Sequence, residues 1–470
     1  MKLPIKIDST SNGEFVPRPL EPINIVANES ARTALAKAAR RTGMPRRTFV
    51  QTAAAVATTL AAFNKVNAAA GRDGGFFAVS QDAPLEPALA QTEIGGNEFI
   101  FDVQGHYVVP PSLAQTLKPR CGEQHAVLDR DYMRCIGADN FIKDIFFDSD
   151  TDVMVLSFIP SRRDDEPLTV AEAAATRELV EQLQGTRRLM IHGRVNPNQA
   201  GDVEAMAELS DRWQVCAWKC YTQWGPDGRG FYLFEDAGLA MIERARALGI
   251  KTICVHKGIP FGRRSYEHST CVDIGVVARQ YPDVNFLVYH AGYVPGSPEG
   301  PYRPGRGDGV DELIASVERA GLGQHSNVYA ELGSTWRMLM RNPEEAAHCV
   351  GKLLKHLGPR NVLYGSDCVW YGSPQDQIQA LRAFRIAPEF QERFGYPELD
   401  AAQRAALLGL NAARVYGIDP QAHHSISGDD ALSAAREAYR GEPAAHFETY
   451  GPRTRREFLQ LWRQHGRQRT

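Results

Sequence analysis

The sequence predicts an α/β protein, a (β/α)8 TIM-like barrel with a C-terminal helical extension. From residue 97 onward, short apolar runs alternate with segments of helical periodicity, which is typical of a parallel sheet covered by helices. Eight such runs occur within about 270 residues, and eight is the strand number of the closed barrel. An open doubly wound sheet is the alternative. It would carry a glycine-rich phosphate loop after the first strand, and the sequence DVQGHYVVPPS at 102–112 is not one.

Composition limits the classes of function. Of 470 residues, 43% are apolar and 23% are charged, which is ordinary for a globular protein. A net charge of −3 gives no electrostatic surface for nucleic acid and no polybasic patch for a membrane. The 8 cysteines include no Cys-x-x-Cys pair, so zinc-knuckle and thioredoxin-type sites are excluded. A small molecule is the expected substrate.

The first seventy residues are predicted to be a leader. Arg46 and Arg47 precede Phe49, a mildly apolar run follows over 50–63, and three alanines end at Ala70. This order resembles a twin-arginine (Tat) export signal cleaved after about Ala70. It implies contact with the Tat machinery, a periplasmic or secreted protein and no permanent membrane anchor. Translation from Met44 instead of Met1 is left open, as is an alanine-rich surface helix in place of a signal.

The barrel is predicted over residues 97–420. The expected strands lie within the runs 99–106, 153–161, 187–197, 214–222, 251–258, 284–292, 327–334 and 361–367. Amphipathic segments at 171–183, 237–248 and 343–357 are expected helices, and Gly358-Pro359 ends the last of them.

Polar residues stand where most of these runs end. Catalytic groups of such barrels lie at the carboxyl ends of the strands. In the first run Asp102, Gln104 and His106 share one parity and should line the mouth of the barrel. The later ligand-type residues are Lys219, His256, His290 and Asp367. Two imidazoles and a carboxylate form a good divalent-metal site, and a third histidine can act as a general acid or base near neutral pH.

Over residues 97–420 the chain resembles the amidohydrolase superfamily. Within it, the nearest branch includes aminocarboxymuconate-semialdehyde decarboxylase and γ-resorcylate decarboxylase. The motifs that carry the resemblance are DVQGH at 102–106, VHKG at 255–258, YHAG at 289–292, YGSDCVW at 364–370 and LLGLNAARVYGID at 407–419.

The resemblance implies one divalent metal ion, expected to be zinc, with manganese or a similar ion as the alternative. Its expected ligands are Gln104, His106, His256 and Asp367, with His290 and Asp367 as catalytic residues. Gln104 departs from the histidine or glutamate usual at that position. Its amide oxygen is a neutral, weaker ligand. Weaker binding, preference for a harder ion and loss of the metal, as in a related pyrone-dicarboxylate hydrolase branch, all stay open.

Other residues are candidates for binding substrate. Lys219 is expected to meet a substrate carboxylate, although in other branches a carbamylated lysine on the fourth strand bridges two metals. Arg194 and Arg263 could also hold a carboxylate, and Trp224 and Trp370 suit a planar substrate. Structural salt bridges and loop packing are the alternative roles of these residues. Glu331, at the end of the seventh run, is expected to support the metal site from behind.

The predicted function is a metal-dependent hydrolase, in which metal-activated water attacks a carbonyl of a small carboxylated or aromatic substrate. A metal-dependent decarboxylase of an aryl or alkenyl acid and a non-catalytic binding protein with a decayed site are the alternatives.

The tail, residues 421–470, is predicted to be helical, with Leu459, Leu461 and Trp462 packing against the barrel or a partner subunit of a possible homodimer.

Overall fold

The sheet of the predicted barrel is present in full. The computed structural model describes residues 2–108, 137–184, 187–261, 266–424, 431–441 and 447–466. Eight strands pair in parallel, in sequence order from β2 to β9. Their bounds are β2 Phe101–Gly105, β3 Val153–Leu156, β4 Leu189–Arg194, β5 Ala217–Tyr221, β6 Thr252–His256, β7 Asn285–Tyr289, β8 Val328–Glu331 and β9 Val362–Leu363. Each lies inside the run predicted for it.

The sheet closes between its first strand and the segment that follows its last strand. Gly105 forms a parallel bridge with Cys368. The Val103 N–H donates to the Tyr364 carbonyl at 3.2 Å, and the Asp367 N–H donates to the Gln104 carbonyl at 2.9 Å. This closure confirms the (β/α)8 barrel and excludes the open doubly wound sheet.

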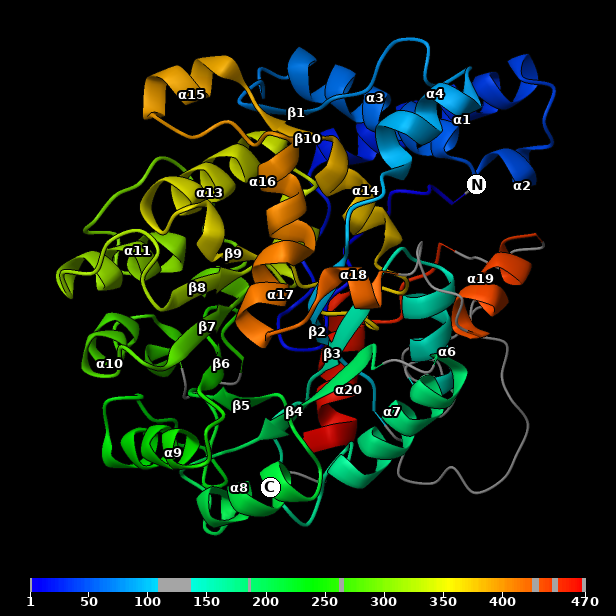
Figure 1. Ribbon diagram of the computed structural model, residues 1–470. Helices are drawn as coiled ribbons and strands as arrows, with labels where there is room; N and C mark the ends of the chain where they lie inside the picture. The colour runs from blue at the N-terminus through cyan, green and yellow to red at the C-terminus, as the bar shows by residue number, and fades with distance from the viewer. Residues whose placement is uncertain are drawn as a thin grey trace.

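Helices follow the strands around the barrel (Figure 1). They are α6 Ala138–Ile142 with the turn η2 Lys143–Phe147, α7 Val170–Gln184, α8 Asp202–Asp211, α9 Asp236–Ala247, η3 Glu267–Ser269, α10 Ile274–Gln280, η4 His290–Gly292, α11 Gly309–Arg319, α12 Thr335–Leu339, α13 Pro343–His356, η5 Pro359–Asn361 and α14 Gln375–Ala383. The strand β10 Phe384–Ile386, α15 Pro388–Phe394, α16 Ala401–Ala405, η6 Ala406–Leu410, α17 Asn411–Tyr416 and α18 Pro420–His423 complete the barrel region. The three helices predicted by their periodicity are α7, α9 and α13.

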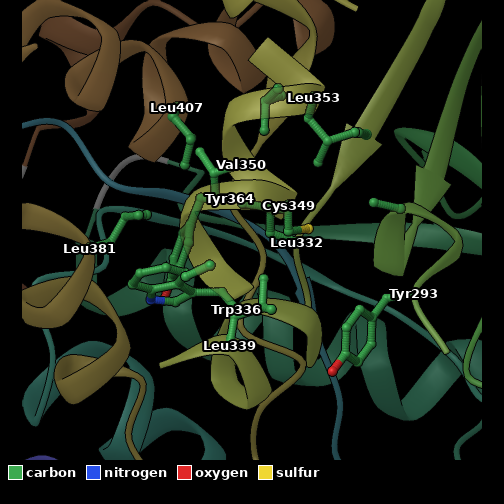
Figure 2. Packing of buried hydrophobic residues seen from close by; sticks show 14 of the residues in the cluster. Tyr293, Leu332, Trp336, Leu339, Cys349, Val350, Leu353, Tyr364, Leu381 and Leu407 are labelled. Atoms are coloured by element: carbon green, nitrogen blue, oxygen red, sulfur yellow. The ribbon is translucent and has the colours of Figure 1, made fainter. Parts of the chain in front are cut away.

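The main apolar core lies between the strands and this outer layer. Figure 2 shows Leu332 from the end of β8, Trp336 of α12 and Val350 of α13 gathered in one cluster. The Trp336 indole N–H donates to the Gln377 carbonyl at 2.9 Å, which satisfies its only donor while the ring stays fully buried. Asn342 caps α13 through its side-chain oxygen, with Pro343 in the first turn.

The region predicted as a leader is folded against the barrel. It contains α1 Pro22–Arg41, α2 Arg46–Phe49 and α3 Ala53–Ala69. It is followed by β1 Gly75–Phe77, α4 Pro87–Ala90 and η1 Gln91–Gly95. The blue and cyan helices of this region form one group beside the barrel (Figure 1). α3 packs along α1 and contacts α4, η1 and β1, and β1 pairs antiparallel with β10. Phe49 is 1% exposed, whereas Arg46 and Arg47 are exposed.

Residues 2–15, here called the N-terminal arm, run along the barrel before α1. Leu3, Ile5 and Ile7 alternate with more polar residues and are all buried. The Lys6 N–H donates to the Asp376 carboxylate at 2.9 Å, and Asp8 forms an ion pair of 2.9 Å with the buried Arg337. The arm is therefore anchored by both apolar burial and charge.

The other end of the chain packs on the same part of the molecule. It comprises α19 Ala431–Gly441 and α20 Arg455–Gly466. The Ser11 N–H donates to the Pro452 carbonyl at 2.9 Å, and Thr10 bonds to Thr449 at 2.8 Å, so the arm lies against the segment before α20. Leu461 of α20 is buried in a cluster that also holds Trp370, whereas Leu459 is exposed. The helical tail thus packs on the barrel; the side chain of Trp462 lies outside the described residues.

No helix among the residues that the structure describes combines the length and the apolar character needed to cross a membrane. Export by the Tat pathway and cleavage after Ala70 stay predictions.

Because Phe49 is enclosed in the leader region, Phe49→Ala should lower the free energy of unfolding of the full chain by about 3–5 kcal/mol through lost burial and a residual cavity. Urea denaturation of the whole chain measures this change. Ile25→Ala is the matched control, because Ile25 is 48% exposed on α1 and its truncation should change stability by no more than about 0.5 kcal/mol. Equal effects of the two substitutions would show that the leader region does not pack as described.

Candidate active site

The predicted site residues gather at one end of the barrel. Gln104 lies in β2 and Lys219 in β5, His256 ends β6, His290 follows β7 directly, and Glu331 ends β8. Asp367 stands just beyond β9, on the segment that closes the barrel. All are at most 2% exposed. The strand ends therefore bring these polar groups into a shielded space, as the barrel rule predicts.

Gln104, His106 and Asp367 form a first group, here called the aspartate cluster. The Gln104 side-chain N–H donates to Asp367 Oδ1 at 3.1 Å, and His106 Nε2 lies 3.3 Å from the same oxygen. Ser334 donates to Asp367 Oδ2. Asp102 has the same parity along the strand as Gln104 and His106. It instead accepts the Ser366 N–H through Oδ1 at 2.9 Å, so it links β2 to the segment after β9 where the barrel closes.

Two of the predicted site histidines face each other. His256 Nδ1 lies 3.1 Å from His290 Nε2. Their outer nitrogens each meet a carbonyl oxygen, His256 Nε2 at Ile259 (3.3 Å) and His290 Nδ1 at Gly333 (2.7 Å). A carbonyl only accepts, so both outer nitrogens carry the proton, and both inner nitrogens carry a lone pair when the rings are neutral.

The N-terminal arm adds two polar residues to this end of the barrel. Glu14 Oε1 lies 3.8 Å from His256 Nδ1, and the Asn12 side-chain N–H group donates to Glu14 Oε2 at 2.7 Å and to Asp367 Oδ2 at 2.9 Å. Glu14, His256 and His290 are here called the Glu–His–His cluster. Within the described part of the chain, no other three acidic, imidazole or thiol groups bring their ligand atoms within 4.8 Å of one another.

The four predicted metal ligands are therefore divided between two neighbouring clusters. His256 belongs to the Glu–His–His cluster, while Gln104, His106 and Asp367 bond to one another in the aspartate cluster. Asn12 bridges the two clusters. Sequence reasoning missed Asn12 and Glu14 because residues 1–70 were assigned to a leader. The alternation of Leu3, Ile5 and Ile7 was the signal of a packed extended segment.

Burial and charge set the protonation states. Burial would raise the pKa of Asp367, but the hydrogen bond and charge of His106, with Ser334, outweigh it and hold that pKa below its usual value. Burial and the nearby Asp367 charge raise the pKa of Glu14 to about 8. Burial lowers the pKa of His290 to about 4 and that of His256 well below its usual value. Both rings are therefore neutral near pH 7.

Glu331 supports His290 from behind. Its two oxygens accept the backbone N–H groups of His290 at 3.0 Å and Gly333 at 2.6 Å. A side chain at Gly333 or Gly365 would collide with Glu331, so these glycines leave the space that the carboxylate fills. Glu331 thus fixes the backbone of His290 and of the carbonyl that orients its ring.

Several non-glycine residues at this end have positive φ, among them Ala291, which follows His290 directly. His290 has a φ of 66°, Asp367 of 58° and Ser334 of 55°. Such conformations cost of order 1–3 kcal/mol each and persist where the surrounding structure holds them. Here the supporting bonds are those of Glu331 to His290 and of Ser334 to Asp367.

Lys219 lies inside the barrel below the histidines. Its Nζ is 3.6 Å from the centre of the Tyr289 ring and 4.9 Å from that of Tyr221, and Tyr221 stacks on His256. Among the described residues the ammonium has no hydrogen-bond partner, and burial lowers its pKa to about 8. The buried cation is thus available to an anionic group.

The remaining predicted residues lie apart from these clusters. Arg194 forms an ion pair with Glu166, which is the structural alternative considered for it. Trp224 is half-buried in the turn after β5, and Trp370 packs in the cluster with Leu461. Arg263 lies outside the described residues.

The Glu–His–His cluster fits a divalent cation. Two imidazole nitrogens bound to one zinc ion at about 2.0–2.1 Å stand about 3 Å apart. The 3.1 Å between the inner nitrogens matches this spacing, and two neutral rings leave two lone pairs facing each other with no proton between them. The carbonyls at the outer nitrogens fix the tautomers in the way that metal-binding histidines require.

A family model described as Amidohydrolase matches residues 160–418, which is more than half of the chain. The match contains His256, His290 and Asp367 but neither β2 nor β3. None of the curated proteins matches the chain.

Several solved structures resemble the barrel. A 2,6-dihydroxybenzoate decarboxylase is 13% identical with a TM-score of 0.41, covering 68% of this chain and 99% of its own. The 5-carboxyvanillate decarboxylase of Sphingomonas paucimobilis is 11% identical with a TM-score of 0.40 and the same coverages, 68% and 99%. The 4-oxalomesaconate hydratase of Rhodopseudomonas palustris is 15% identical with a TM-score of 0.42, covering 73% and 99%. Likeness at this level carries no argument about the reaction.

The facing histidines predict that the full chain, purified without chelator, holds about one equivalent of a divalent metal, and that His256→Ala lowers metal affinity by more than about tenfold. Elemental analysis and metal titration measure both values. His356→Ala, on the outer helix α13, is the control and should keep the wild-type metal content. A metal-free wild-type protein, or equal metal in the two variants, would contradict the site.

Proposed function

The chain belongs to the amidohydrolase family, and from that premise we propose that it is a metal-dependent hydrolase acting on a small carboxylated substrate. His256 and His290 would hold the ion, as their facing nitrogens indicate. A bound divalent ion lowers the pKa of water and polarises a carbonyl group. The other requirements of hydrolysis are a proton acceptor and a group that places the substrate, and this chain's own residues supply both.

Asp367 is the proposed proton acceptor. It accepts hydrogen bonds from Gln104, Asn12 and Ser334, and its pKa is held low, so it is ionised near pH 7. An ionised carboxylate beside a cation site can take the proton that water loses as it attacks a carbonyl carbon. The facing nitrogens of His256 and His290, with Asp367 joined to Glu14 through Asn12, are the observation that carries the proposal.

Lys219 is the proposed substrate anchor. Its ammonium is buried beneath the histidine pair and has no hydrogen-bond partner in the described part of the chain, so a substrate carboxylate would satisfy it. Tyr221 and Tyr289 place aromatic rings beside Lys219, and Tyr221 also stacks on His256. Aromatic rings around the anchor would suit an aromatic or other planar substrate.

Decarboxylation is the second candidate. It requires a proton donor for the carbon that loses carbon dioxide, and His290 is a poor donor near pH 7 because its pKa is lowered to about 4. Glu14 would serve as that donor only in a metal-free site, where its raised pKa of about 8 would leave it protonated near pH 7.

Screening of cyclic esters, amides and carboxylated aromatics in ¹⁸O-labelled water separates the two reactions. We expect a product carboxylate that contains ¹⁸O, and a loss of activity of about 10²–10⁴-fold in Asp367→Asn. Release of carbon dioxide without ¹⁸O in the organic product would show that the protein is a decarboxylase and not a hydrolase. Binding without turnover in any assay would leave a binding protein.

The unpaired ammonium predicts that Lys219→Met raises KM for a carboxylated substrate by about 10–100-fold, since a charge-assisted contact of about 1.5–3 kcal/mol is lost. Steady-state kinetics on the substrate and on its uncharged amide measure the effect. The amide should show little change in KM. An equal rise in KM for both compounds would mean that Lys219 stabilises the barrel and does not bind the substrate carboxylate.

A further inference from the structure

We propose that Glu14 of the N-terminal arm is the third protein ligand of the metal ion, and that the arm is therefore a permanent part of the active site. This inference rests on the proposed metal site. No strand of the barrel carries Glu14, and neither the family match nor the motifs that predicted the site include it.

The position of Glu14 is the first support. A carboxylate oxygen of Glu14 and one ring nitrogen each of His256 and His290 lie within 4.8 Å of one another. Among the described residues, no other three acidic, imidazole or thiol groups come this close together. Asn12 fixes the second oxygen of Glu14 by a hydrogen bond of 2.7 Å, which leaves Oε1 toward the histidines. A carboxylate and two imidazoles are a ligand set that zinc accepts, with further positions open for water or substrate.

The charge of the barrel end is the second support. Gln104 stands where a charged or imidazole ligand was expected, and its amide nitrogen is engaged with Asp367. Asp367 is itself occupied by Gln104, Asn12 and Ser334. Without Glu14, a dication on the two neutral histidines would lack an anionic ligand. Glu14 supplies that charge from outside the barrel.

The anchoring of the arm is the third support. Ile5 and Ile7 are 0% and 5% exposed, Asp8 is paired with Arg337, and Ser11 is bonded to the Pro452 carbonyl. The stretch of the arm that precedes Glu14 is therefore held by the barrel and by the segment before α20. A ligand needs such preorganisation to bind an ion without a large entropic cost.

The same contacts bear on the leader prediction. Cleavage after Ala70 would detach Asn12 and Glu14 from the polypeptide. The exposed Arg46 and Arg47 remain accessible to an export receptor in the folded chain. Export of the intact chain is therefore compatible with the proposed role of Glu14. Only cleavage after Ala70 conflicts with that role.

The test compares Glu14→Gln with Glu21→Gln in the full chain. Glu21 is a matched control, because it lies in the same region and is 55% exposed, away from the histidines. We expect Glu14→Gln to weaken Co²⁺ binding by about 10–100-fold and to change the visible absorption of the cobalt protein, because an amide replaces a carboxylate in the ligand field. Glu21→Gln should match the wild type in both, and Glu14→Asp should recover part of the affinity.

Each outcome has a distinct meaning. Wild-type affinity and an unchanged cobalt spectrum in Glu14→Gln would overturn the role of Glu14 while leaving the histidine site intact. Absence of cobalt binding in the wild type would overturn the proposed metal-dependent function itself. Thermal unfolding of the metal-free variants checks folding. A Glu14→Gln protein unstable without metal would be replaced by Glu14→Ala for the same measurements, with wild-type affinity and spectrum again overturning the proposal.

Mass spectrometry of the natural, metal-containing protein gives an independent check. We expect peptides from residues 2–15 to be present in amounts equal to barrel peptides. A chain that begins near Gly71 and binds cobalt with full-length affinity would overturn the proposal.

Discussion

Closure of the barrel between β2 and the segment after β9 is the constraint on which the site depends. The hydrogen bonds of Val103 to Tyr364 and of Asp367 to Gln104 join the two ends of the sheet. They also set Gln104 and Asp367 side by side, although 263 positions separate them in the sequence. An open sheet would leave these residues on opposite edges, so the polar chemistry exists only because the apolar strands close.

Backbone groups of the closed barrel orient several side chains of the site. The carbonyls of Ile259 and Gly333 select the tautomers of His256 and His290, and Glu331 holds the backbone from which His290 projects. The left-handed conformation of His290 is stabilised by the bond to Glu331, and that of Asp367 by the bond from Ser334. The two inner nitrogens are thereby directed at each other, a repulsive arrangement for neutral rings that a cation relieves.

Sequence reasoning predicted the barrel because its signals are local. Runs such as 251–258 and 284–292 are apolar, and the polar residue at each strand end is visible in the sequence. His256, His290 and Asp367 were therefore found. Arg194 was proposed for substrate from its place beyond a strand, but its partner Glu166 could not be identified from position alone.

Glu14 and Asn12 could not be found in the same way. Their role depends on contacts with residues hundreds of positions away, and the alanine-rich run that follows them resembles a signal peptide. The same run is α3, whose small side chains allow close packing against α1. Composition alone does not distinguish an export signal from a tightly packed helix, because both need a short stretch of small apolar residues.

The meeting of the arm with residues 449–452 has a consequence for how the protein is made. The arm precedes the barrel in the chain, and the residues that Ser11 and Thr10 contact follow the barrel. Contacts of such long sequence separation form late, because the intervening chain must be ordered first. During synthesis the strands of the barrel are therefore made before residues 449–452, and the arm gains these contacts only after the barrel residues have been translated.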